Sequence, residues 1–189
     1  MRTYVHGWLA VLAVVCVNWP TPAPAGDQSE YGLAVGQKMP FHVLDYSLPK
    51  SLGGCPSVMI SNAKSRGLIL WAKSPDDKFF QLAKRLEEPL GSYPNAQGHL
   101  AIFNRPGGLV DVAKKHGIER FHVGAIRTQS QQSMEKFGGL AEADLAVFFL
   151  DQKTIKARWS LKSKDLDQEA SDKIVAAAVK FFEKKKEEK

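Results

Sequence analysis

The sequence predicts an α/β protein in which a mixed, mostly parallel sheet has helices on both faces. Two apolar runs, at residues 67–72 and 145–150, are typical of strands that are buried on both faces. Segments with apolar residues at helical spacing alternate with the predicted strands, which favours parallel pairing. A tight turn at residues 151–153 joins two strands directly, so we expect an antiparallel hairpin before the last helix.

Three strands are predicted before residue 73. Residues 41–45 alternate in polarity, residues 58–60 form a short apolar run, and residues 67–72 form the first buried strand. The segment between the first two strands, residues 47–56, contains two prolines and two glycines and is predicted as a loop.

A helix is predicted directly after this buried strand, because its first residues carry several start signals. Ser74 is a candidate N-cap, Pro75 suits the first helical position, and Asp76 and Asp77 favour the positive end of the helix dipole. Pro89 is expected to close the helix. Apolar residues recur at helical spacing in between: Phe79, Leu82, Ala83, Leu86 and Leu90.

The second half of the chain repeats the alternation of strands and helices. Glycines follow two of the predicted helices, as is common at helix C-termini. The predicted elements are a strand at 99–103, a helix at 109–116, a strand at 121–126, a helix containing Met134 and Phe137, strands at 145–150 and 154–159, and a helix at 167–182.

Residues 1–25 have the features of a secretory signal peptide. Arg2 precedes an apolar run at residues 8–17, and Ala23 and Ala25 provide the small residues before a cleavage site at Gly26. Ten apolar residues are too short to cross about 30 Å of hydrocarbon, which disfavours a membrane anchor. We therefore expect an exported protein, either periplasmic or extracellular.

Residues 26–183 are predicted to form one domain, followed by a charged tail at residues 184–189. The 164 residues left after cleavage are enough for one buried core. Their net charge of +5, from 25 basic and 20 acidic residues, is mild, and the tail mixes lysines with glutamates as a solvated helix end does. We expect no nucleic-acid partner and no membrane span in the mature chain.

Cys55 is the one cysteine outside the leader, since Cys16 is removed with it. A single thiol cannot form an internal disulfide, so the core must stabilise the domain. Three roles are open to Cys55: a small buried side chain, a nucleophile in a glycine-containing loop, or the link of a disulfide-bonded homodimer. We favour the buried structural role, because free cysteines are among the most buried residues.

The mature chain has four histidines, and none is in a spacing typical of a metal site. His42, His99 and His122 fall in or beside predicted strands, so two of them can be neighbours in the sheet, and His116 fits a helix C-terminus. A zinc site requires three or four converging ligands. We therefore expect neither a metal nor a cofactor.

The order of elements resembles the thioredoxin superfamily, in particular its peroxiredoxin and thiol-disulfide branch. Residues 35–45 are similar to the opening pattern of that branch, a glycine and then a proline before an alternating strand that ends in aspartate. Residues 68–72 resemble the strand that leads into the active-site helix, and residues 148–155 resemble the late hairpin. The resemblance implies a three-layer sandwich with a mixed sheet between helices.

The sequence departs from that superfamily at both halves of its redox site. The resemblance implies a reactive cysteine at the start of the helix after the strand at 68–72, where this chain has Ser74, Pro75, Asp76 and Asp77. It also implies a cis-proline before the late strand, where this chain has Asp144 and Leu145. These six positions are therefore interpreted as a degenerate redox site.

These departures indicate an exported thioredoxin-fold module that is redox-inactive and serves as a binding or scaffold domain. Its candidate binding surface lies around Ser74, Pro75, Asp76, Asp144 and Leu145, and its partner is expected to be a protein or peptide. The alternative is a single-cysteine thiol oxidoreductase or peroxidase, in which folding brings Cys55 to the helix start.

Overall fold

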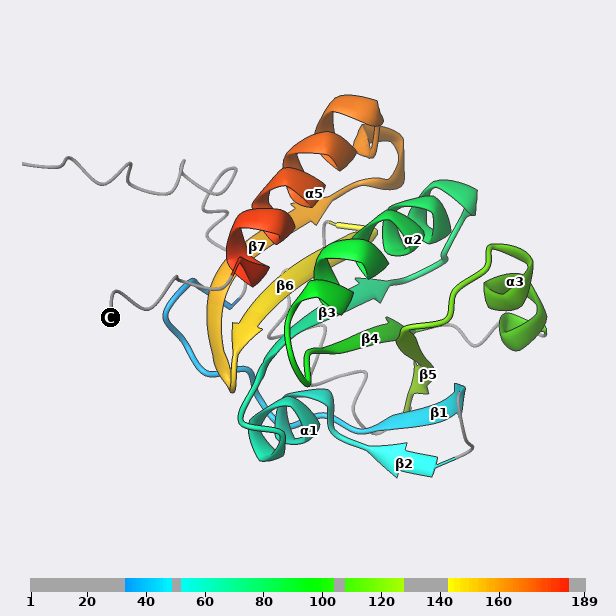
Figure 1. The fold of residues 1–189 in the computed structure, drawn as a ribbon. Helices are drawn as coiled ribbons and strands as arrows, with labels where there is room; N and C mark the ends of the chain where they lie inside the picture. Colours follow the sequence, from blue (N-terminus) through cyan, green and yellow to red (C-terminus); the bar gives the residue numbers. More distant parts are fainter. Residues whose placement is uncertain (1–32, 49–51, 104–107, 128–142, 184–189) are drawn as a thin grey trace, which may run out of the picture.

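The computed structural model describes residues 33–48, 52–103, 108–127 and 143–183. Its centre is a seven-stranded sheet in the order β2-β1-β5-β4-β3-β6-β7 (Figure 1). Strand β4 is parallel to β3 and β5, and all other neighbouring strands are antiparallel. The strands are β1 (Leu44–Leu48), β2 (Leu52–Gly54), β3 (Arg66–Ala72), β4 (Gln97–Ile102), β5 (Phe121–Ile126), β6 (Leu145–Asp151) and β7 (Thr154–Leu161).

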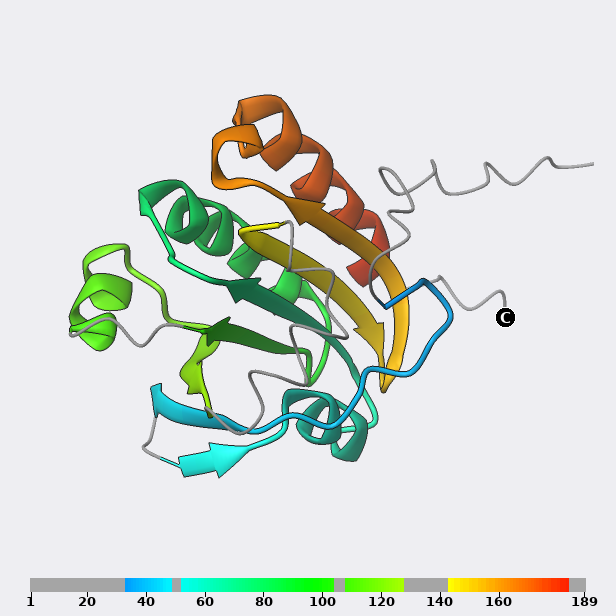
Figure 2. The ribbon, with the colours of Figure 1, turned by 180° about the vertical axis from the view of Figure 1, so that it is seen from behind.

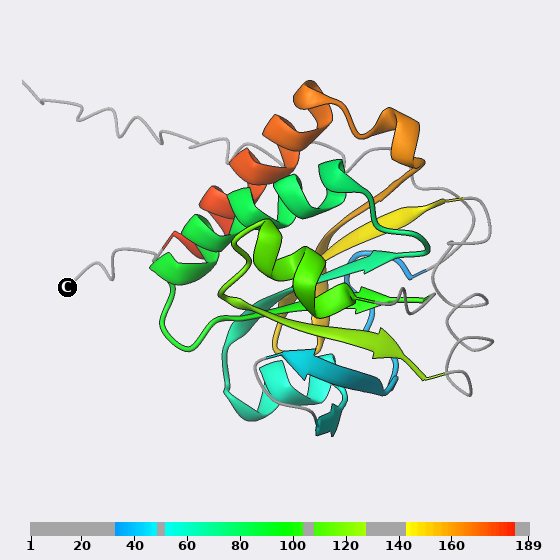
Figure 3. The ribbon, with the colours of Figure 1, turned by 90° about the vertical axis from the view of Figure 1, so that its right-hand side faces the viewer.

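Helices lie on both faces of this sheet, which confirms the predicted α/β class. The expectation of a mostly parallel sheet is wrong, because four of the six neighbouring strand pairs are antiparallel. Apolar side chains of α2 (Asp77–Ser92), α3 (Leu109–Lys115) and α5 (Gln168–Phe182) share one core with the sheet. Helix α1 (Pro56–Asn62) packs on the opposite face through Ile60 (Figure 3). A Cβ on Gly67 would lie 2.4 Å from Cδ1 of Ile60, so only glycine lets α1 come this close to β3.

The lead-in segment, residues 33–43, runs from the β7 edge of the sheet across to β1, next to the opposite edge strand. Backbone N–H groups of Gly36 and Met39 donate to the carbonyls of Ile155 (2.8 Å) and Lys153 (2.8 Å) at the start of β7. The segment then passes to β1, as Figure 2 shows. His42 lies near its end and is buried, whereas the side chain of Phe41 is 72% exposed.

Most of the predicted elements are confirmed, and β5 matches to the residue. Before residue 66 the prediction is only partly right. The strand expected at 41–45 is β1, which begins three residues later, at Leu44. Residues 47–48 and 52–54 of the expected loop belong to the paired strands β1 and β2, and the expected strand at residues 58–60 is helix α1. Pro56 occupies the first position of that helix, where its missing N–H has no intrahelical role, and three apolar residues are too few to distinguish strand from helix.

Both ends of helix α2 also differ from the prediction. Its N-cap is Asp76 rather than Ser74, and Pro89 lies inside the helix, which continues to Ser92. The last turn is retained because it buries Leu90 against the sheet, and because the Ser92 hydroxyl donates to the Pro89 carbonyl (2.7 Å). The helix predicted around Met134 and Phe137 falls outside the described residues.

A buried carboxylate fixes α2 to the chain that enters β5. Glu87 is 5% exposed and accepts hydrogen bonds from the backbone N–H groups of Glu119 and Arg120, both at 2.6 Å. The ammonium of Lys84 also contacts this carboxylate at 2.8 Å. Hydrogen bonds to a charged group are stronger than neutral ones, so Glu87 holds the start of β5 in place.

We expect Glu87→Ala to lower the free energy of unfolding by about 2 to 3 kcal/mol, because two backbone donors lose a charged partner. Glu87→Gln should cost less, since its amide oxygen still accepts a hydrogen bond. Chemical denaturation measures both effects. The exposed neighbour Glu88 provides the control, and an equal loss in Glu88→Ala would contradict this role for Glu87.

Candidate functional site

The starts of α2 and β6 lie side by side at one end of the sheet. Ala72, the last residue of β3, pairs with Leu145, the first residue of β6. The backbone N–H of Lys73 donates to the Asp144 carbonyl at 2.8 Å, which extends the pairing by one residue. The fold therefore brings together the two segments, 74–77 and 144–145, that the sequence analysis singled out.

Carboxylates occupy the positive end of helix α2. Asp76 Oδ1 accepts the backbone N–H of Phe79 at 2.9 Å, which is the usual N-cap interaction. Asp77 follows in the first turn, and its Oδ1 lies 3.0 Å from Nε2 of His116, at the end of α3. The His116 ring also stacks on Phe80 at 5.1 Å, so α3 is held against the start of α2.

The residues on the β6 side of this junction have structural contacts of their own. Asp144 Oδ2 accepts the backbone N–H of Ser163 at 2.9 Å. Leu145 is only 2% exposed and belongs to the core beneath α2, whereas Ser74 is exposed at the surface and Pro75 is partly exposed. Ser74, Pro75, Asp76, Asp77 and Asp144 are therefore the members of the predicted set that reach solvent, whereas Leu145 is buried.

Cys55 is not part of this junction. It is the N-cap residue of α1, it is 5% exposed, and its Sγ lies 3.3 Å from the Ser57 hydroxyl. It directly follows β2, and three strands, β1, β5 and β4, separate β2 from β3 in the sheet. Among the described residues, the start of α2 has no cysteine.

A cluster of buried polar rings lies on the α1 face of the sheet, and the sequence analysis identified it only in part. His99 on β4 and His122 on β5 pair in register and stack, with ring centroids 5.1 Å apart. This confirms that two of the histidines are sheet neighbours. The Tyr46 hydroxyl, from β1, lies 2.8 Å from Nδ1 of His99. Gly124 provides the space for the Tyr46 ring, because a Cβ there would lie 2.9 Å from its Cδ1.

The lead-in segment adds His42 to this cluster. Its Nδ1 lies 3.0 Å from the Pro40 carbonyl, and its ring meets Trp71 of β3 edge to face, with centroids 5.4 Å apart. Trp71 is fully buried and also contacts Phe148 at 4.7 Å. We refer to Tyr46, His42, Trp71, His99 and His122 as the ring cluster.

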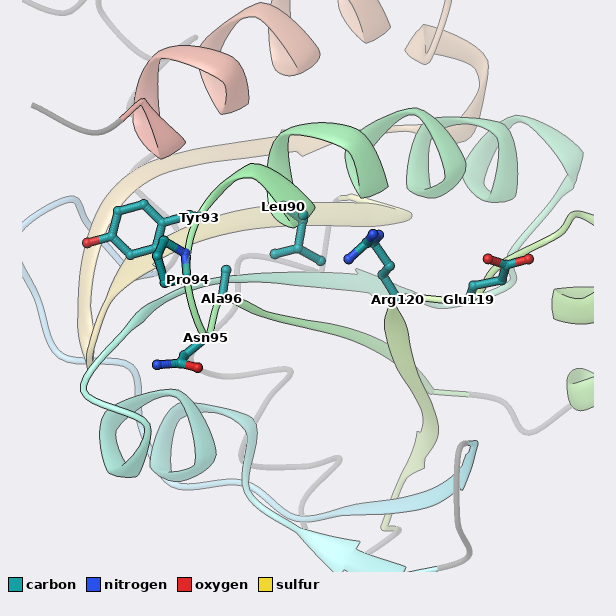
Figure 4. Close-up of a pocket in the computed structure, with 8 residues that line it drawn as sticks. Leu90, Tyr93, Pro94, Asn95, Ala96, Glu119 and Arg120 are labelled. Carbon is teal, nitrogen blue, oxygen red and sulfur yellow. The ribbon is translucent and has the colours of Figure 1, made fainter.

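A separate open pocket of about 480 Å³ lies at the opposite end of the strands. The C-terminal end of α2 and the segments that enter β4 and β5 line it (Figure 4). Its charged residues are Glu119 and Arg120, and the Arg120 guanidinium packs flat against Gly91, where a Cβ would lie 2.8 Å from Cζ. None of the site residues predicted from the sequence lines this pocket.

Comparison with solved structures identifies the fold. A peroxiredoxin-like protein from Aquifex aeolicus superimposes with a TM-score of 0.57 and 15% identity, over 79% of this chain and 88% of its own. A thiol:disulfide interchange protein from a Bacteroides species gives a TM-score of 0.57 with 12% identity, over 82% and 94%. A thiol peroxidase from Chromobacterium violaceum gives 0.53 with 15% identity, over 79% and 89%. The fold is thioredoxin-like.

No protein-family model and no curated protein matches the sequence. At 12 to 15% identity, the structural matches establish the thioredoxin-like fold and carry no activity with them. The function has to be argued from the residues of this chain.

Burial keeps the histidines of the ring cluster neutral at pH 7. Loss of solvation lowers the pKa of His42 to about 4, although its hydrogen bond to Pro40 acts in the opposite direction. The pKa of His99 lies well below its usual value, first because of burial and then because of the nearby His122 and His42. Burial raises the pKa of Tyr46, and the adjacent Cys55 adds to this effect.

In the part of the chain that the structure describes, no group of three or more histidine, cysteine, aspartate or glutamate side chains is arranged to hold a metal ion. The ring cluster contains no carboxylate, and burial disfavours the charged forms of its rings, so it provides hydrogen bonds rather than charge.

We expect acid to destabilise this thioredoxin-like protein through His42. Its folded pKa of about 4 lies below the unfolded value of 6.5, so the unfolded state binds more protons between these pH values. The free energy of unfolding should therefore fall by about 1.4 kcal/mol per pH unit from this group as the pH drops from 6.5 towards 4. Denaturant titrations at several pH values measure the slope.

His42→Asn removes the titrating ring and keeps a donor for the Pro40 carbonyl. We expect this variant to be less stable at pH 7, with a smaller pH slope between 6.5 and 4. A slope equal to that of the unmodified protein would show that His42 does not couple protonation to folding.

Proposed function

We propose that this protein is an exported thioredoxin-like module that binds a protein or peptide partner and performs no thiol redox chemistry. The observation that carries the proposal is the occupation of the α2 N-terminus by Asp76, whose carboxylate accepts the Phe79 N–H. In redox-active relatives of this fold, this helix end is expected to stabilise a cysteine thiolate.

The charges at the N-terminus of α2 disfavour a cysteine thiolate there. Free N–H groups and the helix dipole lower the pKa of a cysteine at a helix N-terminus. Here Asp76 uses one of these N–H groups, and Asp77 adds a second negative charge in the first turn. Two carboxylates stabilise the helix and would repel a neighbouring thiolate.

The position of Cys55 also argues against thiol redox chemistry. It is 5% exposed and caps a different helix, α1, and it directly follows β2, which three strands separate from β3 in the sheet. Its sulfur contacts the Ser57 hydroxyl at 3.3 Å, and Tyr46, the neighbouring titratable group, is neutral. A peroxide or disulfide substrate would have to displace packed side chains to reach this sulfur.

The proposed binding surface is the end of the sheet where α2 and β6 begin. Ser74, Pro75 and Asp76 reach solvent there, next to the partly exposed Asp144. Leu145 packs in the core below this surface and is not available to contact a partner. Backbone pairing of Lys73 with Asp144 and the Asp76 cap make this surface rigid, which lowers the entropy cost of holding a partner.

Export is supported by the leader-like pattern at residues 1–25 and its cleavage signal before Gly26. In the part of the chain that the structure describes, no helix is long and apolar enough to cross a membrane. We propose a periplasmic or extracellular location on this basis.

Alkylation tests whether Cys55 has a structural role. We expect iodoacetamide to label Cys55 slowly in the folded, processed protein and rapidly after denaturation, because its sulfur is buried. A thiol introduced by Ser74→Cys in a Cys55→Ser background is the matched control, and its exposure should give fast labelling. Intact mass measures both rates. Rapid labelling of native Cys55 would favour the thiol-enzyme alternative.

Peptide selection tests the binding surface. We expect a displayed random-peptide library to yield ligands whose affinity falls at least tenfold in Ser74→Lys, because a long charged side chain would cover the junction of α2 and β6. Ala176→Lys on exposed α5 adds the same charge elsewhere and should bind normally. Titration of a selected peptide measures both affinities. Ligands that bind Ser74→Lys unchanged would contradict this location.

A further inference from the structure

Three ring nitrogens of the ring cluster are buried with their hydrogen-bonding capacity unused. Within the described residues, His42 Nε2, Trp71 Nε1 and His99 Nε2 have no hydrogen-bond partner. All three side chains are at most 1% exposed. Native proteins leave few buried polar atoms unpaired, since each costs about 1 to 3 kcal/mol, so three in one cluster require an explanation.

The rings that carry these three nitrogens lie in one region of the α1 face. Trp71 pairs with Ala101, and His99 lies two residues before Ala101 on the same face of β4, so the two rings are diagonal neighbours. The His42 ring contacts Trp71 at 5.4 Å and is close enough to His99 to affect its charge. Ala101 presents only a methyl group between these rings. A fourth unpaired atom, Gln97 Oε1, lies further along the same face of β4.

The hydrogen-bonding roles of these atoms define what fits between them. The Pro40 carbonyl can only accept, so Nδ1 of His42 carries the proton and Nε2 of the neutral ring is an acceptor. Trp71 Nε1 can only donate. If Nδ1 of His99 accepts the Tyr46 hydroxyl proton, Nε2 of the neutral ring is a donor. If Nδ1 donates to the Tyr46 oxygen, Nε2 is an acceptor. A guest must therefore both donate and accept, which excludes a simple anion and a metal ion.

We propose that His42 Nε2, Trp71 Nε1 and His99 Nε2 together bind one internal water molecule. Water has two donors and two acceptors, so it satisfies His42 and Trp71 and then either tautomer of His99. Buried waters typically make about three hydrogen bonds to otherwise unsatisfied groups. The bound water joins the lead-in segment to β3 and β4, and therefore fixes the N-terminal part of the domain onto the sheet.

Two measurements on the purified protein test this site. A crystal structure at a resolution that defines waters should show density within about 3.2 Å of at least two of the three nitrogens. Water-selective NMR should show a rotating-frame cross-peak between the Trp71 indole N–H and a long-lived water. Undisturbed rings without such density, together with an indole N–H that gives no water cross-peak, would overturn the proposal in favour of an N–H contact with the His42 ring face.

A pair of variants separates the water site from the general integrity of the cluster. His42→Phe keeps an aromatic ring against Trp71 and removes the acceptor, so we expect the cross-peak to fall at least severalfold. His122→Phe replaces the ring that stacks on His99, and His122 has no buried nitrogen among the three proposed ligands, so the cross-peak should remain. An unchanged cross-peak in a folded His42→Phe protein would show that His42 is not a ligand of the water.

Discussion

Strand β3 is buried on both faces, and the arrangement of the rest of the domain depends on this burial. Leu68 and Leu70 point into the core beneath α2 and α5, while Ile69 and Trp71 point to the α1 face. A strand in this position requires neighbours on both edges, which β4 and β6 provide. Its last residues therefore bring the start of α2 against the start of β6, where the candidate binding surface lies.

At this junction a carboxylate caps the start of helix α2. The first N–H groups of a helix have no partner within the helix and can bind an anion. Here the N-cap carboxylate of Asp76 accepts one of them, the N–H of Phe79. The adjacent Asp77 meets His116, which ties the same helix end to α3. The fold is thioredoxin-like, and the carboxylates at the start of α2 hold two helices in place.

Much of the fold follows from local patterns, and the failures have identifiable causes. The run from Phe121 to Ile126 is bounded by a glycine-ended helix and is predicted to the residue. The cap of α2 is predicted two residues early because Ser74 and Asp76 are both good caps. The pairing of Lys73 with Asp144, which delays the helix, is a long-range contact. Residues 58–60 are too short a run to define an element.

The two candidate sites differ in how far the sequence alone predicts them. The residue types at 74–77 and 144–145 can be read directly from the sequence, so the proposal of a degenerate redox site there needs only the order of elements. The ring cluster cannot be predicted in this way, because the pairing of His99 with His122 depends on strand register, and the contact of His42 with Trp71 depends on the path of the lead-in segment. Histidines that stand alone in the sequence do not predict that their rings meet in the fold.

Turnover tests the central claim most directly. The processed protein should be assayed for reduction of hydrogen peroxide and of a small disulfide, with dithiothreitol as electron donor, beside Cys55→Ser. The account predicts that both proteins give the background rate, because the α2 N-terminus has no thiol and Cys55 is buried. Robust turnover that disappears in Cys55→Ser would contradict it and identify the protein as a single-cysteine enzyme.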